Sequence, residues 1–224
     1  MPLPASLSPQ DMDLINRIYP VSRETIDRLE AYRRQLLIWQ AKTNLVAPGT
    51  LASFWSRHVA DSLQVKCLCV QARRFADLGS GGGFPGLVLA IANAGLPGAE
   101  HHLIESSQKK SAFLRTVARE TGVMVQIHNE RIESAAGRIA EAALPPEIVT
   151  ARALSPLRDL IALALPFHAK GATGVFHKGR EYLAEIEECN GLWQFDLITH
   201  ASEVEAGSVL LEIRHPVRKT LETA

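Results

Sequence analysis

Hydrophobic and polar residues follow two different rhythms along the chain. Over 21–47 the apolar residues return every three or four positions, with Ser22 placed to cap the start and Pro48-Gly49 placed to end it. This spacing predicts an amphipathic helix. A second helical pattern runs over 50–65. We therefore expect residues 1–70 to form a helical N-terminal extension.

After Arg74 the rhythm changes to short apolar runs separated by helical stretches, which is typical of a parallel sheet covered on both faces. We expect strands over 74–79, 101–105, 123–128, 147–153, 172–177, 193–199 and 208–213, and helices over 85–94, 107–121, 131–142, 156–168 and 180–190. Only "ASEVEAG" separates the last two strands. That segment is too short for a crossover helix, so these strands should pair antiparallel. The predicted fold is α/β and Rossmann-like, a seven-stranded, mostly parallel sheet with an antiparallel last strand over residues 71–224.

Composition describes an ordinary globular chain. Its 224 residues are 46% hydrophobic, enough to bury a sizeable core. Basic and acidic residues are equal in number, 24 of each, so no overall field attracts a polyanion. This balance counts mildly against an RNA substrate, and any contact with nucleic acid must use local basic patches.

The cysteines and the N-terminal segment narrow the class further. Cys67, Cys69 and Cys189 are too few for a disulfide framework, and no second Cys/His pair completes a zinc site, so we expect buried free thiols and no metal. The first residues lack the basic and apolar regions of a signal peptide, and no apolar run is long enough to span a bilayer. We expect a cytoplasmic monomer without membrane contact.

The stretch "FADLGSGGGFPGLVLAI" carries five glycines where a strand runs into a helix. Bare backbone of this kind lets a ligand approach closely, with free N–H groups at the start of the helix. Gly81-x-Gly83-x-x-Gly86 matches the dinucleotide fingerprint, but that pattern alone is weak. A nicotinamide dehydrogenase is therefore one hypothesis, and an enzyme using S-adenosylmethionine is the other.

Two acidic residues bear on this choice. Asp77 lies two residues before Gly79, where a carboxylate would face the negative charge of a pyrophosphate but would suit the ammonium group of S-adenosylmethionine. Its alternative role is to cap the turn. Glu105 ends the next predicted strand, where such folds place an acid that accepts hydrogen bonds from ribose hydroxyls. Glu105 suits either cofactor, and it is equally well placed to cap the helix that follows.

Several motifs together are more specific. "HVADSL", the glycine stretch, "LIESSQKKSAFLRTVARE", "NERIES", "VTARAL" and "FHKG" occur in the order and spacing of the RsmG (GidB) family, which the chain closely resembles from about Trp39 onward. The resemblance implies a class I S-adenosylmethionine-dependent methyltransferase that modifies N7 of one guanine in 16S ribosomal RNA. Two positions depart from the family pattern: Glu105 and Glu147 stand where Asp is common. Both departures keep the charge.

The resemblance also assigns roles to individual residues. Gly79 and Phe84 would contact the cofactor, Glu105 would hold its ribose, Ile132 and Glu133 would flank its adenine, and Arg152 would line the site near the transferred methyl group. Together with Asp77 and Gly81, these residues make up the predicted cofactor site.

The predicted chemistry requires alignment rather than acid or base catalysis. Guanine N7 is an unprotonated in-plane lone pair, so methyl transfer to it needs no general base. Arg152 could donate hydrogen bonds to the O6 or N7 edge of the base or to a phosphate, or it could form a salt bridge with Asp77 or Glu133. His58 and Asp61 share one helical face, and we expect them to pair with each other rather than to act in catalysis.

Contact with RNA must come from clusters of basic residues. We expect Lys178, at the end of a strand, to touch the RNA backbone, and the N-terminal helix to contribute Arg28, Arg33 and Arg34. Because the chain has no net charge, the expected substrate is a shaped surface on the small ribosomal subunit or an assembly intermediate more than a short hairpin. A ribosome-assembly factor that binds the cofactor without useful turnover remains an alternative.

Overall fold

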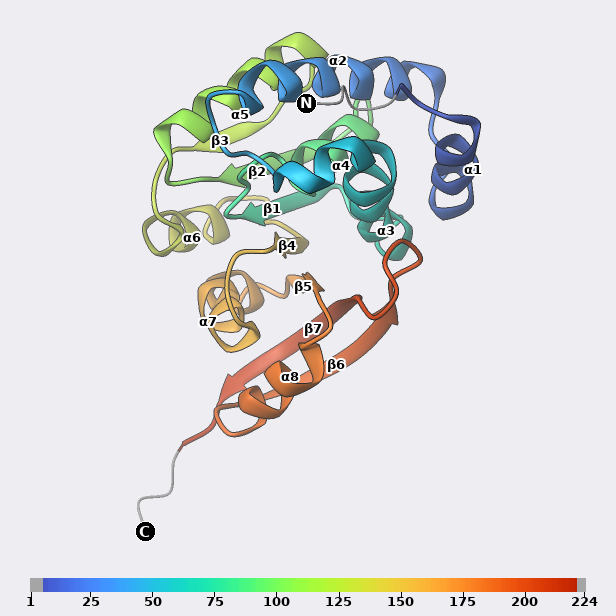
Figure 1. The fold of residues 1–224 in the computed structure, drawn as a ribbon. Coiled ribbons are helices and arrows are strands. Elements are labelled where there is room, and N and C mark those ends of the chain that lie inside the picture. Colours follow the sequence, from blue (N-terminus) through green and yellow to red (C-terminus); the bar gives the residue numbers. More distant parts are fainter. Residues whose placement is uncertain (1–5, 221–224) are drawn as a thin grey trace.

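A computed structural model describes residues 6–220, and within them one sheet lies between two layers of helices (Figure 1). Its seven strands are β1 (Arg74–Leu78), β2 (Glu100–Ile104), β3 (Gln126–His128), β4 (Ile148–Arg152), β5 (Thr173–Lys178), β6 (Trp193–Ala201) and β7 (Val209–Arg218). They lie in the order β3-β2-β1-β4-β5-β7-β6. Strand β7 runs antiparallel to both of its neighbours, β5 and β6, and the other adjacent strands are parallel. The predicted fold class, including the antiparallel last strand, is confirmed.

Helices cover both faces of the sheet, which explains why the inner strands consist of short, continuous apolar runs. One layer contains α1 (Pro9–Ile18), α2 (Arg23–Gln40), α3 (Asp61–Leu68), α4 (Gly86–Ala92) and α5 (Gln108–Thr121), and the other contains α6 (Ile132–Ala140), α7 (Leu157–His168) and α8 (Tyr182–Asn190). Figure 1 shows α2 lying beside α5 on the outside of the first layer. None of the helices in residues 6–220 is both long and apolar enough to cross a membrane.

The N-terminal helix α2 begins where the sequence predicts and ends early. The Ser22 hydroxyl accepts a hydrogen bond from the Thr25 amide, as expected of a cap. The helix stops at Gln40, seven residues before the predicted end at residue 47, because the Gln40 side chain bonds the chain beyond it. Its Oε1 accepts from the amides of Leu45 and Val46, at 3.0 and 3.1 Å, and its Nε2 donates to the Val46 carbonyl. Residues 41–47 therefore form a loop.

Two features of the N-terminal region differ from the sequence prediction. Helix α1 lies outside the individually predicted helices, although Ser8 and Asp11 form a capping box at its start and Pro9 occupies its first turn. The second helical pattern is divided into a 3₁₀ segment η1 (Pro48–Ser53), a π-helix η2 (Phe54–Ala60) and α3. All three cysteines are free, but only Cys189 is buried, since Cys69 is half-buried and Cys67 is exposed.

The predicted extension and the sheet share one apolar core. Ile15, Tyr32 and Leu63 from the extension pack in the same cluster as Phe84 and Phe113, which follow β1 and β2. The boundary at residue 70, between the N-terminal extension and the domain that contains the sheet, stays a prediction. Because the core crosses that boundary, the N-terminal helices pack directly against the loop after β1.

Candidate functional site

The glycine loop joins β1 to α4 and depends on bare backbone at defined positions. Gly79, Gly81 and Gly83 have φ angles of +64°, +55° and +90°, a region that side chains rarely adopt. Gly82 is needed for a different reason. A Cβ there would lie 2.9 Å from the backbone oxygen of Leu45, in the loop after α2. The N-terminal region therefore presses directly on the cofactor loop predicted from the sequence.

Tyr32 of α2 holds this loop in place through a hydrogen bond and a ring contact. Its hydroxyl donates a hydrogen bond to the carbonyl of Gly82, and its ring stacks on Phe84 with centroids 5.1 Å apart. Complete burial raises the pKa of the Tyr32 phenol well above its ordinary value, so the hydroxyl stays a donor. Sequence reasoning missed this role because Tyr32 looked like one more apolar position of an amphipathic helix.

Asp77 lies buried under the loop rather than in an open site. Its Oδ1 accepts a hydrogen bond of 2.7 Å from the Thr150 hydroxyl. Its Oδ2 faces Gly86, where a Cβ would come within 2.6 Å, and has no hydrogen-bond partner among the residues described. Burial raises the pKa of the Asp77 carboxyl to about 6. Its predicted contact with an ammonium group stays a prediction.

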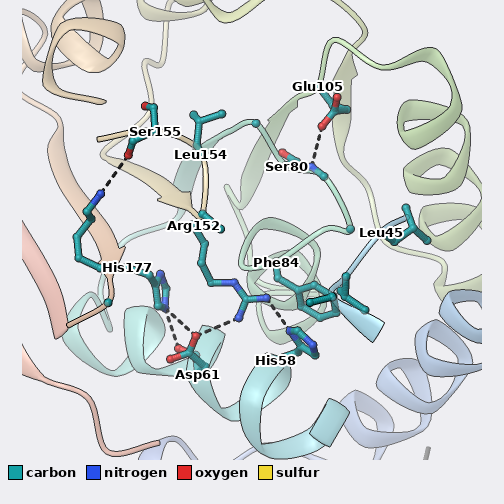
Figure 2. Close-up of a pocket in the computed structure, with 18 of the residues that line it drawn as sticks. Leu45, His58, Asp61, Ser80, Phe84, Glu105, Arg152, Leu154, Ser155 and His177 are labelled. Atoms are coloured by element: carbon teal, nitrogen blue, oxygen red, sulfur yellow. Dashed lines mark hydrogen bonds and ion pairs between the residues drawn. The ribbon is translucent and has the colours of Figure 1, made fainter. Parts of the chain in front are cut away.

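Glu105, at the end of β2, does serve the glycine loop. Its Oε2 accepts from the Gly81 amide at 2.9 Å (Figure 2). Its Oε1 accepts from the Ser107 amide at 2.7 Å. Each carboxylate oxygen retains acceptor capacity for a second donor. Glu105 therefore links the loop to the start of α5 and can also accept hydrogen bonds from ribose hydroxyls.

A cavity of about 930 Å³ opens beside the carboxyl ends of the central strands. This is large for a single ligand site. The predicted cofactor residues that line it are Gly79, Gly81, Phe84, Glu105, Ile132, Glu133 and Arg152, whereas Asp77 is not among the lining residues. Lys178 lines the cavity too, but Arg28, Arg33 and Arg34 lie away from it on α2.

Arg152, the last residue of β4, is held by the N-terminal region. Its Nη1 donates to Asp61 Oδ2 and to the Arg57 carbonyl, both at 3.0 Å, and its Nη2 donates to Nδ1 of His58 at 2.7 Å (Figure 2). The guanidinium also lies over the Phe84 ring, 5.2 Å from its centroid. The alternative in which Arg152 pairs with Asp77 or Glu133 is wrong, because Asp61 is its partner. His58 and Asp61 both turn to Arg152 instead of to each other.

His58 is neutral in this arrangement. Burial, with the charges of Arg152 and Arg57, lowers its pKa to about 3. A guanidinium can only donate, so Nδ1 must be the acceptor and the proton lies on Nε2, which is 3.0 Å from the Thr50 hydroxyl. His58 also stacks on Phe84, with centroids 4.6 Å apart. The π-helix η2 thus supplies both a carbonyl and a ring to Arg152, in keeping with the frequent use of such segments at functional sites.

His177 joins the network from β5. Its Nε2 lies 3.1 Å from the backbone oxygen of Asp61 and 3.7 Å from Oδ2 of the same residue, and burial lowers its pKa. The sequence shows His177 only as a member of a basic cluster. Its contact with Asp61 spans 116 residues, so no local signal predicts it.

Lys178 is paired within the protein, and its predicted contact with the RNA backbone stays a prediction. Its ammonium forms a 2.5 Å ion pair with Glu185 of α8 and donates to the Ser155 carbonyl at 3.0 Å. The same Glu185 carboxylate accepts from the Leu157 amide at the start of α7. Lys178 therefore fixes the loop that follows Arg152.

The basic residues of α2 differ in their surroundings. Arg34 is exposed, Arg28 is half-buried, and Arg33 pairs with Glu30 at 2.8 Å. Their predicted contact with RNA stays a prediction.

Solved structures that resemble this chain include methyltransferases. An O-methyltransferase from Bacillus cereus, solved in complex with SAH, matches with a TM-score of 0.60 at 12% identity, over 92% of this chain and 97% of that one. The O-methyltransferase TomG from Streptomyces achromogenes, in complex with SAM, matches with a TM-score of 0.57 at 14% identity, over 92% and 95%. These likenesses show that the chain has the Rossmann-like fold that these methyltransferases share.

The sequence defines the family more narrowly. The family model of rRNA small subunit methyltransferase G (GidB) matches residues 25–213. Ribosomal RNA small subunit methyltransferase G of Chelativorans sp. is 47% identical over 87% of this chain and 90% of its own length, and that of Brucella ovis is 46% identical over 93% and 96%. The chain belongs to this family. The predicted family and its cofactor, S-adenosylmethionine, are confirmed, and the dehydrogenase hypothesis is wrong.

Proposed function

We propose that this protein transfers the methyl group of S-adenosylmethionine to N7 of one guanine in 16S ribosomal RNA. Family membership supports an enzyme that methylates small-subunit ribosomal RNA. The observation that supports guanine N7 as the methyl acceptor is the charge and hydrogen bonding of the groups around Arg152. They form a neutral, hydrogen-bonded wall in which His58 has no free basic nitrogen.

The residues around the glycine loop fit the cofactor. A Cβ at Gly81 would meet nothing closer than the Gly79 oxygen at 3.6 Å, so this face of the loop is open to a ligand. Glu105 lies beside it with spare acceptor capacity for ribose hydroxyls. Ile132 and Glu133, at the start of α6, line the same end of the cavity and would flank the adenine.

S-adenosylmethionine supplies an electrophilic methyl group to this site. The guanine N7 lone pair forms the new bond to carbon while the carbon–sulfur bond breaks, and its electron pair stays on sulfur. Positive charge thus moves from sulfur to the purine, and no proton is transferred. The protein's task is to align the two reactants, which is sufficient for a large rate acceleration.

Arg152 is placed to align the base. Three of its five N–H groups are bound by Asp61, His58 and the Arg57 carbonyl, and the other two have no partner within residues 6–220. These can donate to guanine O6 and leave N7 unbound, as the reaction requires. Pairing with Asp61 offsets the guanidinium charge, which would otherwise oppose the developing charge on the purine.

The substrate is proposed to be a particle rather than a bare hairpin. The chain has no net charge, and three of the cations that line the cavity, Arg57, Arg152 and Lys178, are already paired with carboxylates. Long-range attraction for naked RNA is therefore weak, and a shaped surface is needed for recognition. Arg28, Arg33 and Arg34 on α2 would contribute to that contact, and the ribosomal substrate implies action in the cytoplasm.

Mass mapping of 16S ribosomal RNA from cells with and without this gene tests the proposal. We expect one guanine to lose an N7 methyl group when the gene is deleted, and the purified protein to restore it on small subunits from the deletion strain. Unchanged methylation would instead support an assembly factor without turnover. Faster methylation of a short hairpin than of the subunit would contradict the proposed substrate.

A further inference from the structure

Of the arginine and lysine side chains that line the cavity, three are paired with a carboxylate. The pairs are Arg152 with Asp61, Lys178 with Glu185, and Arg57 with Glu205, at 3.0, 2.5 and 3.0 Å. All six side chains line the cavity. These three charges are therefore already offset within the protein, although an RNA strand entering the cavity carries a phosphate at every nucleotide.

The three pairs differ in exposure to water. The Arg152 and Asp61 side chains are 17% and 16% exposed, and Lys178 is 8% exposed, whereas Arg57 and Glu205 are 47% and 39% exposed. Exposed ion pairs contribute little to stability because water competes for both partners. Arg57 is therefore the cation that can change partners without leaving a buried carboxylate uncompensated.

Glu205 lies on the hairpin between β6 and β7, and this hairpin is fixed independently of the ion pair. The Gln64 amide of α3 donates to the Ser202 hydroxyl at 3.2 Å and accepts from the Glu203 amide at 2.8 Å. The hairpin would thus keep its place if Glu205 lost Arg57. The Arg57 backbone is fixed as well, because its carbonyl accepts from Arg152. Only the two charged side chains are free to exchange.

We propose that Arg57 binds a phosphate of the RNA substrate, and that its guanidinium stays paired with Glu205 until the RNA binds. A phosphate offers Arg57 the same two-oxygen geometry as a carboxylate, with more charge. Because the Arg57 carbonyl also holds Arg152, a phosphate bound here would sit next to the residue that aligns the base. This inference rests on the proposed function, since it assumes that RNA enters the cavity.

If Arg57 exchanges Glu205 for a phosphate, substitutions of these two residues should change RNA affinity in opposite directions. Glu205→Gln removes the competing charge and should tighten RNA binding about threefold to fivefold, the range expected for an exposed pair. Arg57→Gln should weaken binding by at least as much and should reduce the salt dependence of binding by about one released ion. A purely structural pair would give the same sign for both variants.

Glu203→Gln is the matched control. Glu203 lies on the same hairpin and pairs with Arg17 of α1 at 3.7 Å, with side chains 53% and 66% exposed, but it does not line the cavity. It should leave RNA binding within twofold of the unsubstituted protein. All three variants should keep the same melting temperature and the same affinity for S-adenosylmethionine.

Binding is measured with small subunits from cells lacking this gene and with a single-stranded RNA oligonucleotide, across a range of salt concentrations, and KM for methylation is measured with the subunits. Effects of equal sign for Glu205→Gln and Arg57→Gln, or an effect of Glu203→Gln as large as that of Glu205→Gln, would overturn the inference. Failure of the unsubstituted protein to methylate the subunits would count against the proposed function instead. The binding measurements would still decide the role of Arg57.

Discussion

Arg152 at the end of β4 donates a 2.7 Å hydrogen bond to Nδ1 of His58, across the boundary between the N-terminal helices and the sheet. The bond is possible because His58 is neutral, with its proton on Nε2 facing Thr50. Asp61 completes the clamp on the same guanidinium. The residue predicted to align the substrate is thus positioned by a segment outside the sheet.

His58→Ala should lower kcat about 10- to 100-fold, the effect of losing one hydrogen bond to a charged group, and should leave S-adenosylmethionine affinity unchanged. His58→Asn is the matched variant, because its amide oxygen can accept from Arg152 near the position of Nδ1. It should restore much of the rate. Steady-state kinetics and calorimetry separate the two effects, and equal losses in both variants would show that the ring acts only by packing on Phe84. Since the pKa of His58 is about 3, this residue should add no inflection to the rate between pH 5 and pH 8.

Asp77→Asn tests the raised pKa of the carboxyl that is buried under the glycine loop. The folded protein holds the Asp77 proton more tightly than the unfolded chain, with a pKa of about 6 against an ordinary 3.8. Between about pH 4 and pH 6 the unfolded state therefore releases this proton first, and the free energy of unfolding falls as pH rises, by about 3 kcal/mol in total. Denaturant titrations should show this fall in the unsubstituted protein and its absence in Asp77→Asn. Parallel profiles for the two proteins would contradict the shift.

The same variant tests the predicted contact with the ammonium group of the cofactor. If that group stabilises ionised Asp77, S-adenosylmethionine should bind more weakly as pH falls through about 6, and Asp77→Asn should bind weakly at every pH. Calorimetry between pH 5 and pH 8 measures both. Affinity that is equal in the two proteins and independent of pH would leave Asp77 a purely structural residue of the turn.

Tyr32→Phe removes the hydroxyl that holds the Gly82 carbonyl. We expect a loss of about 1–3 kcal/mol in the free energy of unfolding, because the carbonyl loses its donor inside the core, together with weaker binding of S-adenosylmethionine. Tyr19→Phe is the control, since the Tyr19 hydroxyl makes no hydrogen bond to the described part of the chain. A cofactor affinity unchanged by Tyr32→Phe would show that the loop keeps its form without α2.

Lys178→Met separates a structural lysine from one that binds RNA. Because it leaves Glu185 without its partner, we expect a loss of about 3 kcal/mol in stability. Adding Glu185→Gln should recover much of that loss, since Gln keeps an acceptor for the Leu157 amide. A double-mutant cycle by denaturant titration measures the coupling. Weaker RNA binding at unchanged stability would restore the role predicted from the sequence.

The sheet and the glycine loop could be predicted because their signals are local. Period and run length identify strands and helices, and the loop after β1 requires glycine wherever φ is positive. The end of α2 could not be predicted, because it depends on the Gln40 side chain bonding residues five and six positions later.

The contacts of Arg152 show a second limit on what can be predicted from the sequence. Asp61 and His58 meet Arg152 across 91 and 94 residues of sequence, and the spacing of the first two suggested a pairing with each other. For Lys178 the sequence indicated the right edge of the sheet but not that Glu185 of α8 would reach the same place. Charges near a site can be predicted from the sequence, whereas their partners depend on how separate elements pack.

The shared core can form only late in the synthesis of the chain. Tyr32 and Leu63 leave the ribosome well before Phe84 and Phe113, with which they are buried in the folded protein. A nascent chain of about seventy residues therefore displays apolar helix faces that nothing yet covers, and long-range contacts of this kind form slowly. Until α5 has emerged, the N-terminal helices are a target for chaperones and for aggregation.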